Sequence, residues 1–179
     1  LGNFANRVIR FLHSNYQSIV PNPQQGYQAI AEQGKESFEG WRERINAQVS
    51  VYLESMEVTK LKIALKAALA ISTIGNELLA AQKLDNALFN NQRSICDAVL
   101  YEAINILYLL SSLFYPFIPD ACEDLLKQLN APLSPIHDSY LESSILPGHR
   151  IGNPFHLFSR IEPDQVKKLK EKYGGSPSA

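Results

Sequence analysis

Cysteine is almost absent from this 179-residue chain, which carries only Cys96 and Cys122. The two stand far apart and neither belongs to a CxxC pair, so the sequence argues against a disulfide framework and against a structural zinc site. We expect both thiols to fill core space in a protein of a reducing, cytoplasmic compartment.

Histidine is also scarce, and the pattern of phosphate-binding loops is missing. The four histidines share neither a helical face nor the spacing of metal ligands: His13, His137, His149 and His156. No Gly-rich phosphate loop occurs anywhere in the chain. The sequence therefore predicts no metal site, no catalytic site and no bound cofactor.

Charge of either sign is not in excess. The chain has 17 Lys and Arg residues against 18 Asp and Glu residues, for a formal net charge of -1. Because autonomous nucleic-acid binders are usually basic, this balance fits a module that makes a few specific contacts beside a larger body. No signal peptide is visible, and polar residues interrupt the longest apolar run, Ala98 to Pro119, so we expect a buried helix and no membrane association.

Apolar residues recur at helical spacing along most of the chain, which predicts an all-α fold. The expected architecture is an antiparallel bundle of about five helices within residues 1–130. We expect a loop around Pro21, Pro23 and Gly26, and a polar connector over residues 82–93. The predicted helices run to about residue 16, over 38–56, over 58–81, from about 95 to just before Pro116, and over 121–129.

The character of the sequence changes after residue 130. Five prolines break any long periodicity in this part: Pro132, Pro135, Pro147, Pro154 and Pro163. We therefore predict an extended tail over 131–179 that packs on another surface, with a short basic helix at about 163–172.

A polar stripe marks the first predicted helix. Asn3, Arg7, Arg10 and Ser14 fall on one side of it, while Phe4, Val8, Phe11 and Leu12 fall on another. An amide and a guanidinium one turn apart offer a fork of donors suited to phosphates or base edges. On these four residues alone, a solvated helix face is the favoured interpretation.

Four segments of the chain together change that interpretation. They are Gly2-Asn3-x-x-x-Arg7, the helix over 60–79, Tyr115-Pro116-Phe117-Ile118-Pro119, and the tail with Leu146-Pro147-Gly148-His149-Arg150-Ile151-Gly152. In this order they resemble the anticodon-binding domain of methionyl-tRNA synthetases of the eukaryotic type.

The resemblance implies a helical class I synthetase domain that recognises the CAU anticodon of methionine tRNA. It implies that Asn3 and Arg7 read the wobble cytosine, since single-stranded loops expose their base edges. The parent would be an ATP-dependent methionine-tRNA ligase whose catalytic domain, in the same polypeptide, binds ATP and methionine. The His-x-Gly-His and Lys-x-Ser-Lys motifs of that catalytic domain are absent here, so this part alone is expected to be non-catalytic.

One departure from the family pattern concerns base stacking. The resemblance implies a Pro-Trp pair after the central helix, which bacterial and animal members carry and whose indole stacks on an anticodon base. This chain has Leu84-Asp85 there, and the form Lys83-Leu84-Asp85-Asn86 favours a fungal member. A carboxylate accepts a hydrogen bond from the cytosine amino group and repels the uracil carbonyl. We therefore hypothesise that Asp85, with Asn86 and Phe89, reads the base. The slightly favoured alternative is that Asp85 caps the next helical turn or pairs with Arg7.

Three cations near these segments are candidates for phosphate contacts: Arg10, Lys83 and Arg93. A rival interpretation is a helical protein-protein interaction scaffold with incidental RNA binding. The near-neutral charge and the missing Trp favour the rival. The ordered series of family-like segments disfavours it more strongly.

Overall fold

The computed structural model describes residues 1–33, 37–140, 144–159 and 161–174 and confirms the all-α prediction. Within those ranges the only β pairing is an isolated antiparallel bridge between Ile19 and Arg150. The helices are α1 (Gly2–Tyr16), α2 (Gln24–Glu32), α3 (Phe38–Glu57), α4 (Leu61–Ala81), α5 (Asn86–Asn91), α6 (Arg93–Phe114), α7 (Pro119–Leu129) and α8 (Pro163–Tyr173).

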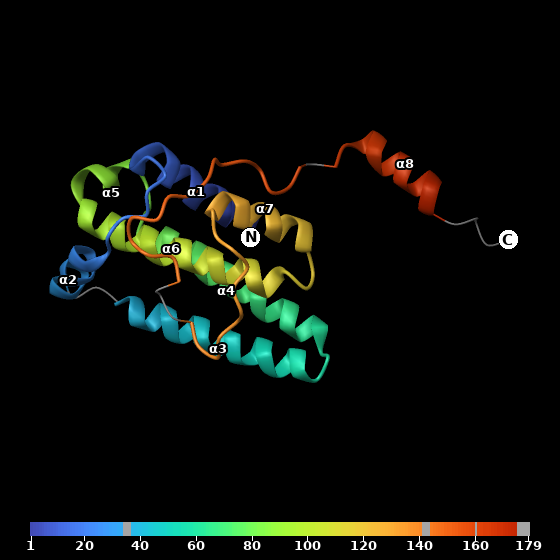
Figure 1. Cartoon of the computed structure of the whole chain (residues 1–179), viewed down its shortest axis with the longest axis horizontal. Helices are drawn as coiled ribbons and strands as arrows, with labels where there is room; N and C mark the ends of the chain where they lie inside the picture. Colours follow the sequence, from blue (N-terminus) through green and yellow to red (C-terminus); the bar gives the residue numbers. More distant parts are fainter. Residues whose placement is uncertain (34–36, 141–143, 160, 175–179) are drawn as a thin grey trace.

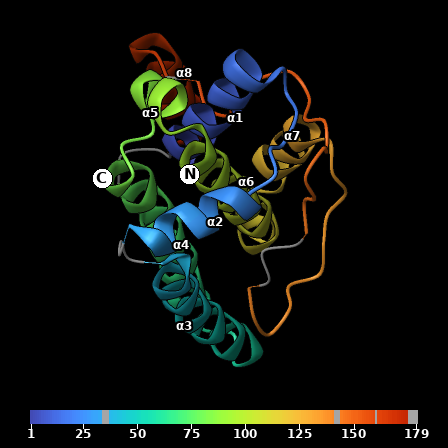
Figure 2. The same cartoon turned by 90° about the vertical axis from the view of Figure 1, so that its left-hand side faces the viewer.

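Helix α6 is the centre of the bundle, and α1, α2, α4 and α7 pack around it (Figures 1 and 2). Nearly all of its residues are buried, as expected for a helix that is apolar on every side. On length and composition alone, α4 and α6 could each cross a membrane. Because 83% of the apolar stretch of α6 is buried inside the bundle, its hydropathy is that of a core helix.

Helices α3 and α4 form a long antiparallel hairpin that extends beyond α6 (Figure 2). The apolar side of α3 faces the bundle, and the Tyr52 hydroxyl donates a hydrogen bond to the Leu113 carbonyl at 2.9 Å. Trp41 is buried, with the Arg44 guanidinium 5.0 Å from its ring centre. The single tryptophan is therefore a packing residue of α3.

Two helices were not predicted from the sequence. Helix α2 occupies the segment that Pro23 and Gly26 marked as a loop. A Cβ atom on Gly26 would lie 2.1 Å from the Ser94 carbonyl oxygen, so glycine serves there to let α2 approach α6 closely. Helix α5 lies in the predicted polar connector and is too short for an apolar period to reveal it.

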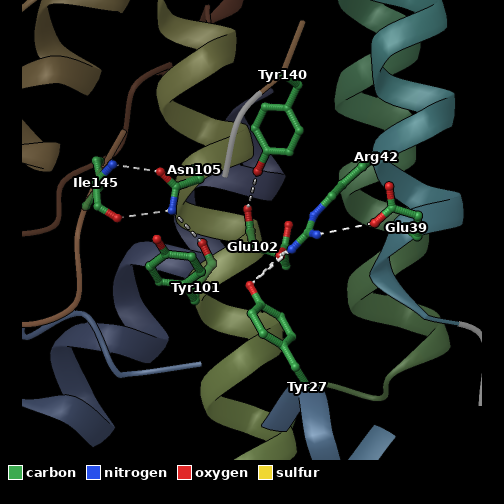
Figure 3. A network of polar contacts seen from close by, with 8 residues as sticks. All are labelled: Tyr27, Glu39, Arg42, Tyr101, Glu102, Asn105, Tyr140 and Ile145. Atoms are coloured by element: carbon green, nitrogen blue, oxygen red, sulfur yellow. Dashed lines mark hydrogen bonds and ion pairs between the residues drawn. The ribbon is translucent and has the colours of Figure 1, made fainter. Parts of the chain in front are cut away.

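A buried ion pair joins the outer helices to α6 (Figure 3). Arg42 of α3 contacts the carboxylate of Glu102 of α6, which is only 2% exposed. The Tyr27 hydroxyl of α2 donates to the same carboxylate at 2.6 Å. Burial and the charge of Glu102 both raise the pKa of Tyr27 above its usual range. A buried charge is costly unless it is paired and hydrogen-bonded, and here α2, α3 and α6 supply the paired and hydrogen-bonding side chains.

In its described residues, the tail lies against the bundle as far as Phe158 and then leaves it. Asn105 of α6 accepts from the backbone nitrogen of Ile145 at 2.8 Å and donates to its carbonyl oxygen at 3.2 Å (Figure 3). Further along, the Gly152 nitrogen donates to the Gln128 carbonyl at 2.8 Å. Helix α8 is exposed on all sides and stands away from the bundle (Figure 1).

Candidate nucleic-acid interface

The outer face of α1 presents a continuous row of side chains at a spacing of four residues. Asn3 and Arg7 are exposed on it, and Phe11, half-buried, takes the next turn. Phe4 and Val8, one position further along, are fully buried. The helix thus rests on its apolar stripe and presents the amide and the guanidinium to solvent.

An aromatic cluster fixes α5 against the C-terminal half of α1. The Phe89 ring of α5 lies 6.2 Å from the Phe11 ring and 5.3 Å from the Tyr16 ring, both nearly edge-on. The Arg93 guanidinium lies 4.1 Å from the ring centres of both Tyr16 and Phe89. Two of the predicted site residues, Phe89 and Arg93, therefore meet in one cluster with α1.

Asp97 holds this cluster in place through two contacts. It pairs with Arg93 at 3.0 Å and accepts a hydrogen bond from the Tyr16 hydroxyl at 2.7 Å. Burial is the main cause that raises the pKa of Tyr16 far above its usual range, and the hydrogen bond to Asp97 adds to it. Tyr16 is therefore a neutral donor at any physiological pH, while half of the Arg93 side chain stays exposed.

Asp85 is the N-cap of α5. Its Oδ1 accepts a hydrogen bond from the backbone nitrogen of Leu88 at 2.8 Å, as in a regular helix cap. The capping alternative considered for this residue is therefore present in the structure. No hydrogen bond or ion pair between the described residues joins Asp85 to Arg7.

The loop between α4 and α5 borders a cleft of about 620 Å³. Asp85, Lys83 and the polar side chains of Asn91 and Gln92 line it together with Leu88. Lys83 adopts a left-handed backbone conformation with a φ of 49°, which turns the chain sharply after α4. Asn86, the first residue of α5, is exposed beside Asp85. The cleft thus carries a cation, a carboxylate and amides, but no aromatic ring.

The tail covers the start of α1. Arg10 donates a hydrogen bond to the imidazole of His156 at 3.2 Å. A cavity of about 180 Å³ lies between the tail and α1, with Asn3 in its wall. Reasoning from the sequence missed this neighbourhood, although the apolar run over residues 155–158 signals a segment that packs on something.

The two cysteines are core residues, as expected. Cys96 and Cys122 are fully buried and unpaired, and burial raises the pKa of each thiol to about 11. Among the described residues, no three His, Cys, Asp or Glu side chains come close enough together to hold a metal ion.

Comparison with known proteins identifies a family for this arrangement. A family model described as the anticodon binding domain of methionyl tRNA ligase matches residues 28–178. The probable cytoplasmic methionine–tRNA ligase of Schizosaccharomyces pombe is 36% identical over 99% of this chain and 22% of that protein. The cytoplasmic methionine–tRNA ligase of Saccharomyces cerevisiae is 35% identical over 98% of this chain and 22% of that protein. The chain thus spans only about a fifth of the length of these relatives.

A solved structure agrees on the fold. The apo form of Mycobacterium tuberculosis methionyl-tRNA synthetase superposes with a TM-score of 0.65 and 20% identity. The superposition covers 91% of this chain and 32% of that one.

Proposed function

This chain belongs to the family of methionyl tRNA ligase anticodon-binding domains, and we propose that it reads the CAU anticodon of methionine tRNA. In the proposal the parent is an ATP-dependent methionine–tRNA ligase of the cytoplasm, as the two yeast relatives are named. Its catalytic domain, elsewhere in the same polypeptide, binds ATP and methionine. The observation that carries the proposal is the exposed Asn3 and Arg7 row on a helix fixed to the bundle on its other side.

Asn3 and Arg7 act as the readers of the wobble cytosine. The Watson–Crick edge of cytosine offers two acceptors, O2 and N3, whereas uracil has a donor at N3. A guanidinium has donors only, so Arg7 favours cytosine at this position. The Asn3 amide adds a donor and an acceptor one helical turn away.

Asp85 completes the base contact from the cleft after α4. The capping bond to Leu88 uses one carboxylate oxygen, and a carboxylate has about four acceptor sites. The remaining sites suit the cytosine amino group and repel the uracil carbonyl. Asn86 and Phe89 support this position from α5, and Arg10, Lys83 and Arg93 contact phosphates on either side of the base.

The test is binding of this chain to two RNA hairpins that differ only in carrying CAU or UAU in the loop. We expect Arg7→Ala to reduce the preference for CAU by about 1 to 3 kcal/mol, or roughly 5- to 150-fold. Lys62→Ala is the charge-matched control and should leave the preference unchanged. It removes an exposed cation at the N-terminal end of α4, the end away from the loop that carries Asp85.

Equal loss of affinity for both hairpins would mean that Arg7 contacts only phosphate. A wild-type chain without any preference between the hairpins would overturn the proposed function. That result would leave the helical protein-protein scaffold as the better description.

A further inference from the structure

The tail brings two exposed aromatic rings to the start of α1. Phe155 is 42% exposed and Phe158 is 52% exposed. Together with His156 and Leu157 they form one wall of the cavity whose opposite wall is Gly2, Asn3 and Asn6 of α1. A Cβ atom placed on Gly2 would lie 2.9 Å from Cδ2 of Phe158, so this ring rests directly on the backbone beside Asn3.

The position of these rings is fixed by contacts on both sides. The Phe155 nitrogen donates to the Gln128 side-chain oxygen at 2.9 Å, which ties the segment to α7. The hydrogen bond between Arg10 and His156 ties the next residue to α1. The segment is therefore held against α1 by polar contacts, while its rings stay largely open to solvent.

The cavity joins the two surfaces that a nucleobase needs. Its volume is about 180 Å³. A cavity that holds a single water needs only ~10–15 Å³, so this one has room for a much larger group. One wall is aromatic, for the flat face of a base, and the other carries amides, for its edge. The cleft after α4, by contrast, has no aromatic ring in its lining.

We propose that Phe158 is the stacking surface for the anticodon base whose edge Asn3 holds. The inference rests on the proposed function, because it takes an exposed base of the anticodon loop as the occupant of the cavity. Phe158 is the ring that lies on the residue next to Asn3, and Phe155 is a second ring in the lining of the cavity. The tail thus provides, from 155 residues away in the sequence, the aromatic ring that the α4–α5 loop lacks.

Binding of the full chain to the CAU and UAU hairpins tests this assignment. Stacking is nearly independent of base identity, so Phe158→Leu should weaken binding of both hairpins by about 5- to 100-fold and keep the preference for CAU. Arg7→Ala, by contrast, changes the preference. Phe158→Tyr keeps the ring and should restore affinity. Tyr173→Leu removes an exposed ring of α8 outside the cavity and is the matched control.

A spectroscopic readout separates stacking from a structural role. Pyrrolocytosine, a fluorescent cytosine analogue at the wobble position, should be quenched on binding to the wild type and to Phe158→Tyr, but much less by Phe158→Leu at saturation. Unchanged affinity and quenching in Phe158→Leu would overturn the inference while the CAU preference of the wild type upholds the proposed function. The stacking inference is also overturned if Phe158→Tyr lacks the affinity and the quenching of the wild type. A wild type that does not distinguish the hairpins overturns the proposed function itself.

Discussion

Gly75 of α4 contacts Phe4 of α1, the helix that carries Asn3 and Arg7, and this contact can be tested. Gly75 lies in the interior of α4, and a Cβ atom there would stand 2.6 Å from Cζ and 2.8 Å from Cε1 of Phe4. The Phe4 side chain is 0% exposed, so its ring has packed neighbours on every side. Phe4 also directly follows Asn3 in α1. Any displacement of its ring is therefore felt at the proposed base contact.

Two opposing terms decide the effect of Gly75→Ala. Alanine in a helix interior is favoured over glycine by about 1 kcal/mol. Overpacking a tight core costs about 1 to 3 kcal/mol, and a ring without room to move places this site at the upper end. We therefore expect a net loss of about 2 kcal/mol in the free energy of unfolding. For a chain of this size that is about 4 to 8 °C in Tm.

Urea unfolding of four proteins measures this effect: wild type, Gly75→Ala, Phe4→Leu and the double variant. Leucine in place of Phe4 removes the clashing ring atoms, so in this background Gly75→Ala should cost much less than it does alone. The difference is the coupling energy of the pair. A single Gly75→Ala variant that is more stable than wild type would refute the reasoning, because helix propensity would then outweigh the contact.

Three further outcomes are expected. Asp85→Ala should lower the free energy of unfolding by about 1 kcal/mol, because it removes the cap on the Leu88 nitrogen. Asp85→Asn should keep most of that stability and lose the preference for the CAU hairpin. If the preference stays intact in Asp85→Asn, Asp85 does not contact the base. Burial raises the pKa of Cys96 from 9.0 to about 11, so the thiol of the unfolded chain loses its proton at a lower pH than that of the folded chain. The free energy of unfolding should therefore fall by about 2 kcal/mol between pH ~9 and ~11. Urea unfolding across that range should show a smaller fall for Cys96→Ala. Asn105→Ala leaves both buried backbone groups of Ile145 without their partner, which should cost about 2 to 4 kcal/mol and speed hydrogen exchange of the Ile145 amide; unchanged exchange would show that the tail is held elsewhere.

The sequence predicted the elements whose apolar period is long enough to read. Helices α1, α3, α4, α6 and α7 each bury a face or a full circumference, and their expected bounds fall close to the observed ones. Gly26 shows why the prediction of a loop in place of α2 was wrong. A glycine in a polar segment indicates a turn, and only the structure shows that it admits the Ser94 carbonyl of α6.

The exposure of Asn3 and Arg7 on α1 was predictable from the sequence, but their surroundings were not. An exposed row on an amphipathic helix is a local property, so spacing predicts it, whereas the reading role of the two residues rests on the family resemblance and stays a prediction. The neighbours of that row are not local. His156 and Phe158 reach α1 through a proline-broken segment that is bonded to α7. Arg93 lies over Tyr16, a residue that is 77 positions earlier in the chain. No pattern within one window of sequence contains these contacts.

The packing of α1 bears on how a chain of net charge -1 would read RNA as proposed. Phe4 is locked against Gly75 on one side of Arg7, and Phe11 packs on Phe89 on the other. The backbone that carries the guanidinium is therefore ordered before any RNA arrives, and binding must immobilise only the side chain. Preorganisation of this kind lowers the entropic cost of association, which otherwise has to be met by additional contacts or by charge. A few donors on a rigid helix can discriminate between bases even where the domain as a whole attracts phosphate only weakly.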